Sequence, residues 1–228
     1  MVFCISNTFS QVQLVDDLNA EARNLVGSYN KIIVAGGIDV YLTQSDSEGV
    51  AVSASEQKYK DAIKTEIKDN TLKVYFDGDR NWSFKSRNLR AYISFKDLKL
   101  LDVSGASDVV VAGKISARNL VMKFSGASDF TGRVEVVTLD LNLSGASDIK
   151  ISGSASVLTI NSSGASDVNG FGLISDICKA RASGASDIDI SVKEELTAEA
   201  SGSSEITYRG NPVINGVNKS GSSSVKKG

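Results

Sequence analysis

The chain has 228 residues, a formal net charge of −2 and no histidine. A nearly neutral chain lacks the general basic surface that nucleic acids and anionic membranes attract, and the absence of histidine excludes catalytic triads, metal sites and general bases that depend on it. Aromatic residues make up 7% of the chain, which argues against an extended platform for stacking sugars, and no stretch approaches the ~20 apolar residues of a membrane-spanning helix.

The first ten residues, MVFCISNTFS, differ in composition from everything that follows. They are apolar and then small and polar, which is typical of the end of a secretion signal, and we expect cleavage near residues 8–11. The alternative is a native strand that packs on the end of the fold. Cys4 lies in this segment and leaves lipid attachment open.

Residues 11–103 are expected to form an N-terminal β part, continuous in one domain with the rest of the chain. The segment VAGGIDVYL at 34–42 can be laid over VSGASDVVV at 103–111, which puts Asp39 in the place of Asp108. A second diverged turn is expected at residues 52–56. Strands are expected at 62–67, 71–76 and 89–95.

A polar loop is expected at residues 77–88, and it carries the only tryptophan of the chain. We interpret part of it as a surface that contacts carbohydrate; the residues are Asp77, Asp79, Arg80, Trp82 and Arg87. The alternative is an ordinary connection with one packed aromatic ring.

From residue 104 to residue 228 the string SGASD recurs. It begins at Ser104, Ser125, Ser144, Ser163 and Ser183, and degenerate copies begin at Ser201 and Ser220. Successive copies lie 18 to 21 residues apart. A fixed period near 20 predicts stacked repeats, in which each unit needs its neighbours to bury its apolar face.

Apolar and polar residues alternate on both sides of each string, which is the pattern of a half-buried strand. Leucines occupy the fifth position before the first serine in most copies, and Cys178 takes that position in one. We therefore interpret Cys178 as a small buried hydrophobic residue. Together with Cys4 it does not form a disulfide framework.

Each repeat thus predicts two short strands joined by a tight serine–glycine corner, coiled in parallel as a single-stranded β-helix with 19–20 residues per turn. The corners contain Gly105, Gly126, Gly145, Gly164, Gly184 and Gly202. Glycine suits such a corner because it accepts a positive φ. A leucine-rich repeat has a similar period but needs a helical segment and an asparagine ladder that this chain lacks.

An acidic residue follows each of these six corners, at Asp108, Asp129, Asp148, Asp167, Asp187 and Glu205. Stacked turns would place these side chains about 4.8 Å apart, where like charges repel by roughly 0.8 kcal/mol in water. One interpretation is local capping, in which carboxylates accept hydrogen bonds from corner amides and the adjacent serines bond along their own ladder. The alternative is a stripe for Ca²⁺ or another ligand, since Ca²⁺ favours several oxygen ligands.

The segment NKIIVAGGIDVYLTQ at 30–44, the serial SGASD turns and the closing residues 210–212 and 220–227 resemble the head GIN domain family of auto-transporter adhesins of Bacteroidetes. The resemblance covers residues 28–227. It implies a right-handed parallel β-helix on an exported, envelope-associated protein. The family has no catalytic motif to transfer to this chain.

The function expected from these observations is a non-enzymatic adhesin or surface-interaction module, in the periplasm, the outer membrane or at the surface of a Gram-negative bacterium. Its partner would be a glycan or a host or envelope protein, with no cofactor and no nucleic acid. The alternative is a carbohydrate-binding or pectinase-like polysaccharide-active protein, because β-helices also include lyases and hydrolases and the fold alone assigns no activity. A glycosidase needs two carboxylates in unlike environments, whereas the repeated acids here are equivalent.

Overall fold

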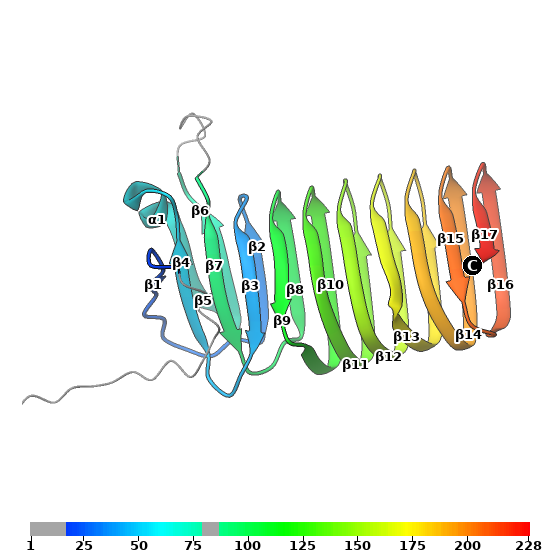
Figure 1. Ribbon diagram of the computed structural model, residues 1–228, viewed down its shortest axis with the longest axis horizontal. Helices are drawn as coiled ribbons and strands as arrows, with labels where there is room; N and C mark the ends of the chain where they lie inside the picture. The colour runs from blue at the N-terminus through cyan, green and yellow to red at the C-terminus, as the bar shows by residue number, and fades with distance from the viewer. Residues whose placement is uncertain (1–16, 79–86) are drawn as a thin grey trace, which may run out of the picture.

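The predicted corners and strands form an elongated stack in the computed structural model, which describes residues 17–78 and 87–228 (Figure 1). Cys4 and the expected signal remnant at 1–10 lie outside these residues. In chain order the described elements are β1 (Glu21–Ala22), β2 (Lys31–Ala35), β3 (Asp39–Gln44), β4 (Gly49–Ser53), α1 (Gln57–Ala62), β5 (Ile63–Lys68), β6 (Thr71–Phe76), β7 (Arg90–Phe95), β8 (Leu100–Gly105), β9 (Asp108–Ala112), β10 (Ile115–Gly126), β11 (Asp129–Leu143), β12 (Asp148–Ser162), β13 (Asp167–Ala182), β14 (Asp187–Gly202), β15 (Glu205–Arg209), β16 (Val213–Gly221) and β17 (Ser224–Lys227).

Two walls of strands face each other across the core. The strands that run into the serine–glycine corners form the incoming wall, in the order β5-β6-β2-β8-β10-β11-β12-β13-β14-β16. The strands that leave the corners form the outgoing wall, in the order β1-β4-β7-β3-β9-β11-β12-β13-β14-β15-β17. The long strands β11 to β14 contribute to both walls because each bends at the edge opposite the corners (Figure 1).

Equivalent residues of successive turns lie side by side in these walls. The incoming wall stacks Leu120, Leu139, Leu158, Cys178 and Leu196. The outgoing wall stacks Phe130, Ile149, Val168, Ile188 and Ile206. All of these side chains are buried, so the predicted in-register parallel β-helix is confirmed, and Cys178 is a small hydrophobic residue of the core.

The side chains of one core column become smaller toward the C-terminus. In the column just before the corner, Phe124 and Leu143 of the middle turns give way to Ala182 and Ala200 in later turns, and all four are buried. This column therefore contributes less buried apolar surface in the late turns than in the middle ones.

The N-terminal part does not stack in chain order. The β2–β3 layer has β8–β9 on one side and β6–β7 on the other. Val40 is paired with Val109, so Asp39 lies level with Asp108, as the overlay of the two segments predicted. The β5–β6 hairpin turns at Asp69 and Asn70, both with positive φ, the backbone that two-residue hairpin loops favour.

The prediction of a diverged turn at residues 52–56 is wrong. Strand β4 pairs antiparallel with β7, and the chain then enters α1, whose Tyr59 and Ala62 are buried. This segment lacks the glycine that a corner requires, so it cannot make the tight reversal between two walls. The strand expected at 62–67 accordingly begins one residue later, after the helix.

Glycine in the corners meets two separate constraints. Gly145 has φ +86°, and a Cβ added there would lie 2.4 Å from the carbonyl oxygen of Gly126 in the preceding turn. Gly113 has a similar φ of +84° but no atom within 4 Å of the equivalent Cβ position. Substitution at Gly113 therefore measures the free-energy cost of the strained backbone alone, whereas substitution at Gly145 adds the cost of the close approach to the preceding turn.

We expect Gly113→Ala to lower the free energy of unfolding by about 1–2 kcal/mol, because only the left-handed backbone is strained. Gly145→Ala should cost about 3 kcal/mol or more, because overpacking adds to the same strain. Urea unfolding followed by circular dichroism measures both. Equal losses would show that the turns do not approach each other at the corner.

Candidate functional site

The serine ladder lies inside the row of corners. Ser147 Oγ donates to the carbonyl of Ser144 at 3.4 Å and accepts from the backbone N–H of Ser128 at 3.4 Å. Most other turns repeat the first bond, and the donors are Ser107, Ser128, Ser166, Ser186, Ser204 and Ser223. The ladder is a structural device, because its buried hydroxyls are occupied within and between turns.

The acidic column runs along the exposed side of the same corners. Asp129 Oδ1 accepts the backbone N–H of Asp148 at 3.1 Å, and Asp187 Oδ1 accepts that of Glu205 at 3.2 Å. Asp167 Oδ1 accepts from Asp187 at 3.3 Å in the same way. Each of these three carboxylates thus accepts a hydrogen bond from an amide of the following turn, which opposes the repulsion between neighbouring charges.

The neighbouring charges still affect the pKa of Asp148. Burial raises the pKa of its carboxyl group, and the neighbouring Asp129 and Asp167 carboxylates raise it further. A hydrogen bond from the backbone of Asp167 acts in the opposite direction. In the described part of the chain no three His, Cys, Asp or Glu side chains are grouped so that they could hold a metal ion; the cation stripe stays a prediction.

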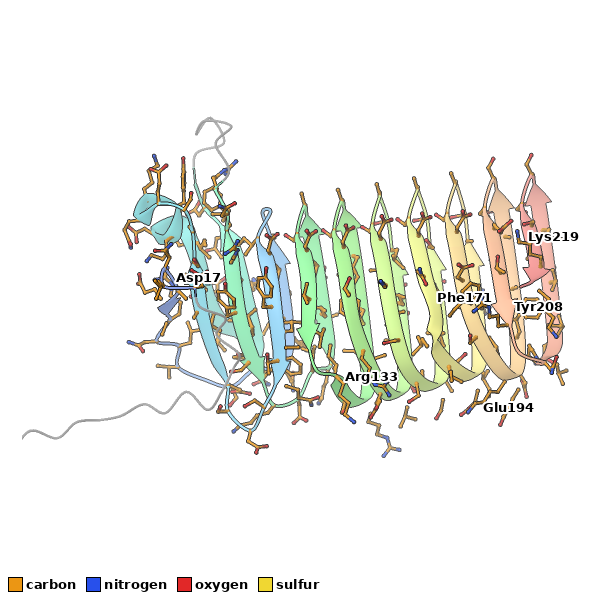
Figure 2. All side chains as sticks on the ribbon, viewed as in Figure 1. Asp17, Arg133, Phe171, Glu194, Tyr208 and Lys219 are labelled. Carbon is orange, nitrogen blue, oxygen red and sulfur yellow. The ribbon has the colours of Figure 1, made fainter. Side chains whose placement is uncertain are left out.

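The acidic column also borders a groove of about 470 Å³ on the outgoing wall. Its polar lining consists of Asp129, Thr131, Asp148, Lys150, Asp167, Asn169, Asp187 and Asp189. Farther down this wall, a register shift in β13 accompanies Phe171 (Figure 2). The Cζ atom of Arg209 lies 3.9 Å from the centre of the Phe171 ring. This guanidinium covers one face of the ring, which is therefore closed to a stacked sugar.

A larger groove, of about 560 Å³, lies on the incoming wall and runs across five turns. One side is formed by the outward residues two positions before each corner, Asn142, Asn161, Arg181, Glu199 and Asn218. The other side is formed by the corner serines Ser163, Ser183, Ser201 and Ser220. Because serine is short, a channel remains between the longer side chains and the corners.

Contacts within this incoming-wall groove hold its side chains in place. Asn161 Nδ2 donates to Asn142 Oδ1 at 3.0 Å, and Asn142 Nδ2 donates to Asp140 Oδ1 at 2.8 Å. Arg181 forms two bonds to the Glu199 carboxylate, at 2.8 and 3.3 Å, and this contact lowers the pKa of Glu199. Each group keeps further donors or acceptors free for a ligand.

The charged groups of the incoming-wall groove are few. Glu199 is the single carboxylate of its lining, and it is ion-paired with Arg181. General acid–base catalysis at a glycosidic bond needs two carboxyl groups with separated roles. Amide, hydroxyl and guanidinium groups in a row are instead suited to hydrogen bonding with an extended polar ligand.

The sequence-predicted contact loop is only partly covered by the structure. Asp79, Arg80 and Trp82 lie outside the described residues. The Asp77 backbone N–H bonds to the carbonyl of Ala62, and Arg87 stacks over the ring of Phe76 at 5.0 Å. The role of this loop in carbohydrate contact stays a prediction.

Sequence reasoning missed the incoming-wall groove. Alternation predicts that the polar residues two positions before each corner face outward, but alternation alone does not show that they border a channel. The signal available in the sequence was their change of character, from charged residues at Asp102 and Lys123 to amides at Asn142 and Asn161. Within the described residues no helix is long and apolar enough to cross a bilayer.

Asp148→Asn tests the capping role of the acidic column. The amide oxygen still accepts a backbone N–H, and the repulsion from two neighbours is removed, so we expect stability at pH 7 to be retained or raised. Asp148→Ala loses the acceptor and should cost about 1 kcal/mol. Because the folded pKa of Asp148 is raised, acidification through it protonates the wild type and should abolish any advantage of Asp148→Asn.

Urea unfolding at pH 7 and at mildly acidic pH measures these differences. EDTA should leave the melting temperature of the wild type unchanged. A drop in EDTA that Ca²⁺ reverses, and that Asp148→Asn no longer shows, would contradict capping as the main role of the column.

Comparisons with known proteins agree with this architecture. Residues 28–212 match the family described as "Putative auto-transporter adhesin, head GIN domain". A search of curated proteins found no match.

Solved structures share the fold. A putative adhesin from Bacteroides fragilis has 22% identity and a TM-score of 0.84, covering 91% of this chain and 95% of that one. A putative adhesin from Parabacteroides merdae has 19% identity and a TM-score of 0.72, with 93% and 97% covered. A putative lipid binding protein from Parabacteroides distasonis has 20% identity and a TM-score of 0.69, with 93% and 98% covered. At these identities the likeness concerns the fold alone, whereas the family match spans most of the chain. The chain therefore belongs to the head GIN domain family.

Proposed function

We propose that this protein is a non-enzymatic adhesion module of an exported envelope protein, and that the incoming-wall groove is its binding surface. The observation that carries the proposal is the repetition of equivalent polar side chains along one open channel. An array of this kind favours many weak contacts with a repeating ligand over chemistry at a single point.

The location is supported by the family, whose description names auto-transporter adhesins, and by adhesin-named structures from Bacteroides and Parabacteroides. The composition of residues 1–10 is consistent with export. The location that we propose is the periplasm, the outer membrane or the surface of a Gram-negative cell.

The chemistry of the incoming-wall groove favours an extended carbohydrate as the ligand. Its lining combines amides at Asn142 and Asn161, the Arg181–Glu199 pair and a row of hydroxyls. These groups donate and accept in the manner that sugar hydroxyls require, and the two charges of the ion pair offset each other. Successive turns repeat about every 4.8 Å, a spacing comparable to the length of one sugar unit in an extended chain. A host or envelope protein is the alternative partner.

A polysaccharide lyase or hydrolase receives less support. Arg181 is bonded to Glu199, and the acids of the outgoing wall occupy equivalent positions in successive turns. Catalysis would instead need an asymmetric set of groups with distinct protonation states.

The test is a screen of the purified protein against arrays of glycans and matrix proteins, with a reducing-end assay for product. We expect carbohydrate to be bound without release of fragments. The double variant Asn161→Ala, Arg181→Ala should weaken binding at least tenfold, because it removes neutral and charged hydrogen bonds that together exceed about 1.4 kcal/mol.

The matched control is Thr131→Ala, Lys150→Ala, which alters two exposed polar residues of the outgoing wall. This variant should bind like the wild type. An equal loss of carbohydrate binding in both double variants, or turnover of a polysaccharide, would contradict the proposed function.

A further inference from the structure

We propose that the edge of the rod opposite the corners is a dimer interface, through which two copies of this chain associate side by side in opposite directions. The surface consists of residues 114–118, 133–138, 154–157, 174–177 and 193–195. We call it the bend face, because the strands β11 to β14 bend there (Figure 1). The proposal does not rest on the function proposed for the incoming-wall groove.

The centre of the bend face is apolar although it is exposed. Ten large hydrophobic side chains are exposed in the described part of the chain. Four of them gather in three successive turns of the bend face, and their exposed fractions are 38% to 49%; they are Val137, Val157, Ile174 and Ile177. Val157 pairs with Ile177, and Val137 adjoins Thr138, the residue that pairs with Val157 on the other side. A contiguous apolar patch with a polar rim favours an interaction surface.

Cations predominate on the side of this patch toward the N-terminal end. They are Lys114, Arg118 and Arg133, and Glu135 is the one acid among residues 114–118 and 133–138. Glu135 bonds to Lys114 and to Arg133. Arg118 is exposed and has no hydrogen-bond or ion-pair partner among the residues that the structure describes. Its neighbours in β10 pair with the neighbours of Val137 in β11, so this unpaired cation lies beside the apolar patch.

Acids predominate on the other side of the patch. They are Asp176, Glu194 and Glu195, and Lys193 is the one cation among residues 174–177 and 193–195. Lys193 lies 3.4 Å from Asp176. Glu195 pairs with Ile177 in register, so Glu194 borders the patch as well. Glu194 is exposed, and within the described ranges it has no hydrogen-bond or ion-pair partner.

Reversal of one copy makes the two sides complementary. A two-fold axis through β12, the middle turn of the bend face, brings the Val157 side chains of the two copies together and sets β10 of one copy against β14 of the other. Arg118 of one copy then faces Glu194 of the partner subunit, and the converse contact forms on the other side of the axis. Arg133 and Glu194 both lie at this edge of the rod, with Glu194 nearer the C-terminal turn (Figure 2). Such a surface is self-complementary, and its charges fix the direction of the partner.

Other occupants of the bend face fit less well. A second copy in the same direction would place cations against cations and acids against acids. An anionic membrane would attract one side of the patch and repel the other. An unrelated protein would have to carry the same series of apolar and charged groups in reverse order, which this chain itself supplies when it is turned round.

The dimer would leave both incoming-wall grooves open. Those grooves are bordered by the corner serines, whereas the bend face lies at the opposite edge of the rod. Two grooves in one assembly would strengthen binding to a long ligand. The bend face spans four strand spacings, about 19 Å, which is short for a stable interface, so the dimer should form only as the protein concentration rises.

Sedimentation equilibrium of the full chain over a range of concentrations measures this association. We expect monomer and dimer in equilibrium without larger species, because a two-fold interface closes on itself. Val157→Lys places two ammonium groups at the axis and should weaken the dimer about tenfold or more. The matched control is Val110→Lys on the outgoing wall, since Val110 is 42% exposed and Val157 is 38% exposed. The control variant should dimerise like the wild type, and circular dichroism checks that both variants are folded.

Charge reversal tests the direction of the partner. Arg118→Glu and Glu194→Arg should each weaken the dimer about tenfold, because each substitution creates two like-charged pairs across the axis. The two substitutions combined in one chain restore opposite charges at both contacts and should restore the dimer. This rescue is expected only if the two positions meet across the interface.

A monomer at every concentration, a dimer that Val157→Lys leaves intact, or assemblies larger than a dimer would overturn the proposal. Failure of the combined charge reversal to restore the dimer would overturn the antiparallel arrangement. If the chain stays monomeric and binds phosphatidylcholine vesicles in a way that Val157→Lys abolishes, the patch belongs to a membrane contact instead. None of these measurements uses carbohydrate, so their failure is distinguishable from failure of the proposed function.

Discussion

The close approach of successive corners is the constraint on which the rest of the molecule depends. The N–H of Ala146 bonds to the carbonyl of Gly126 at 2.7 Å, and the same bond recurs at 2.7 or 2.8 Å from the corner at Gly105 to the last turn. Only a residue without a Cβ leaves room for that carbonyl. Once the corners are in register, every other residue of the repeat must lie over its counterpart, because the chain length per turn is nearly constant.

Because the turns stack in register, each residue type of the repeat recurs along the rod. A leucine that would bury little surface alone becomes part of a continuous buried column, and the buried serine hydroxyls find partners in the next turn. The same repetition places the aspartate of each turn beside that of the next, which produces a line of like charges. Hydrogen bonds from the next amide, as from Asp148 to Asp129, oppose that repulsion locally.

Function in such a molecule is spread along a surface. The incoming-wall groove presents polar side chains at equivalent positions of five successive turns. This surface follows from the translational order of the stack.

The spacing of SGASD and the alternation around it were enough to predict the parallel stack, the buried columns and the alignment of Asp39 with Asp108, because a fixed period and a period of two are local properties of a chain. The order of the N-terminal layers, the helix in place of a turn at 52–56 and the Asn142–Asn161 contact beside the corner serines were decided by tertiary structure. Each of these depends on which segments become neighbours across long stretches of chain. Which segments become neighbours depends on how much surface is buried and how much backbone is paired over the whole fold. The pattern of a single segment does not hold this information.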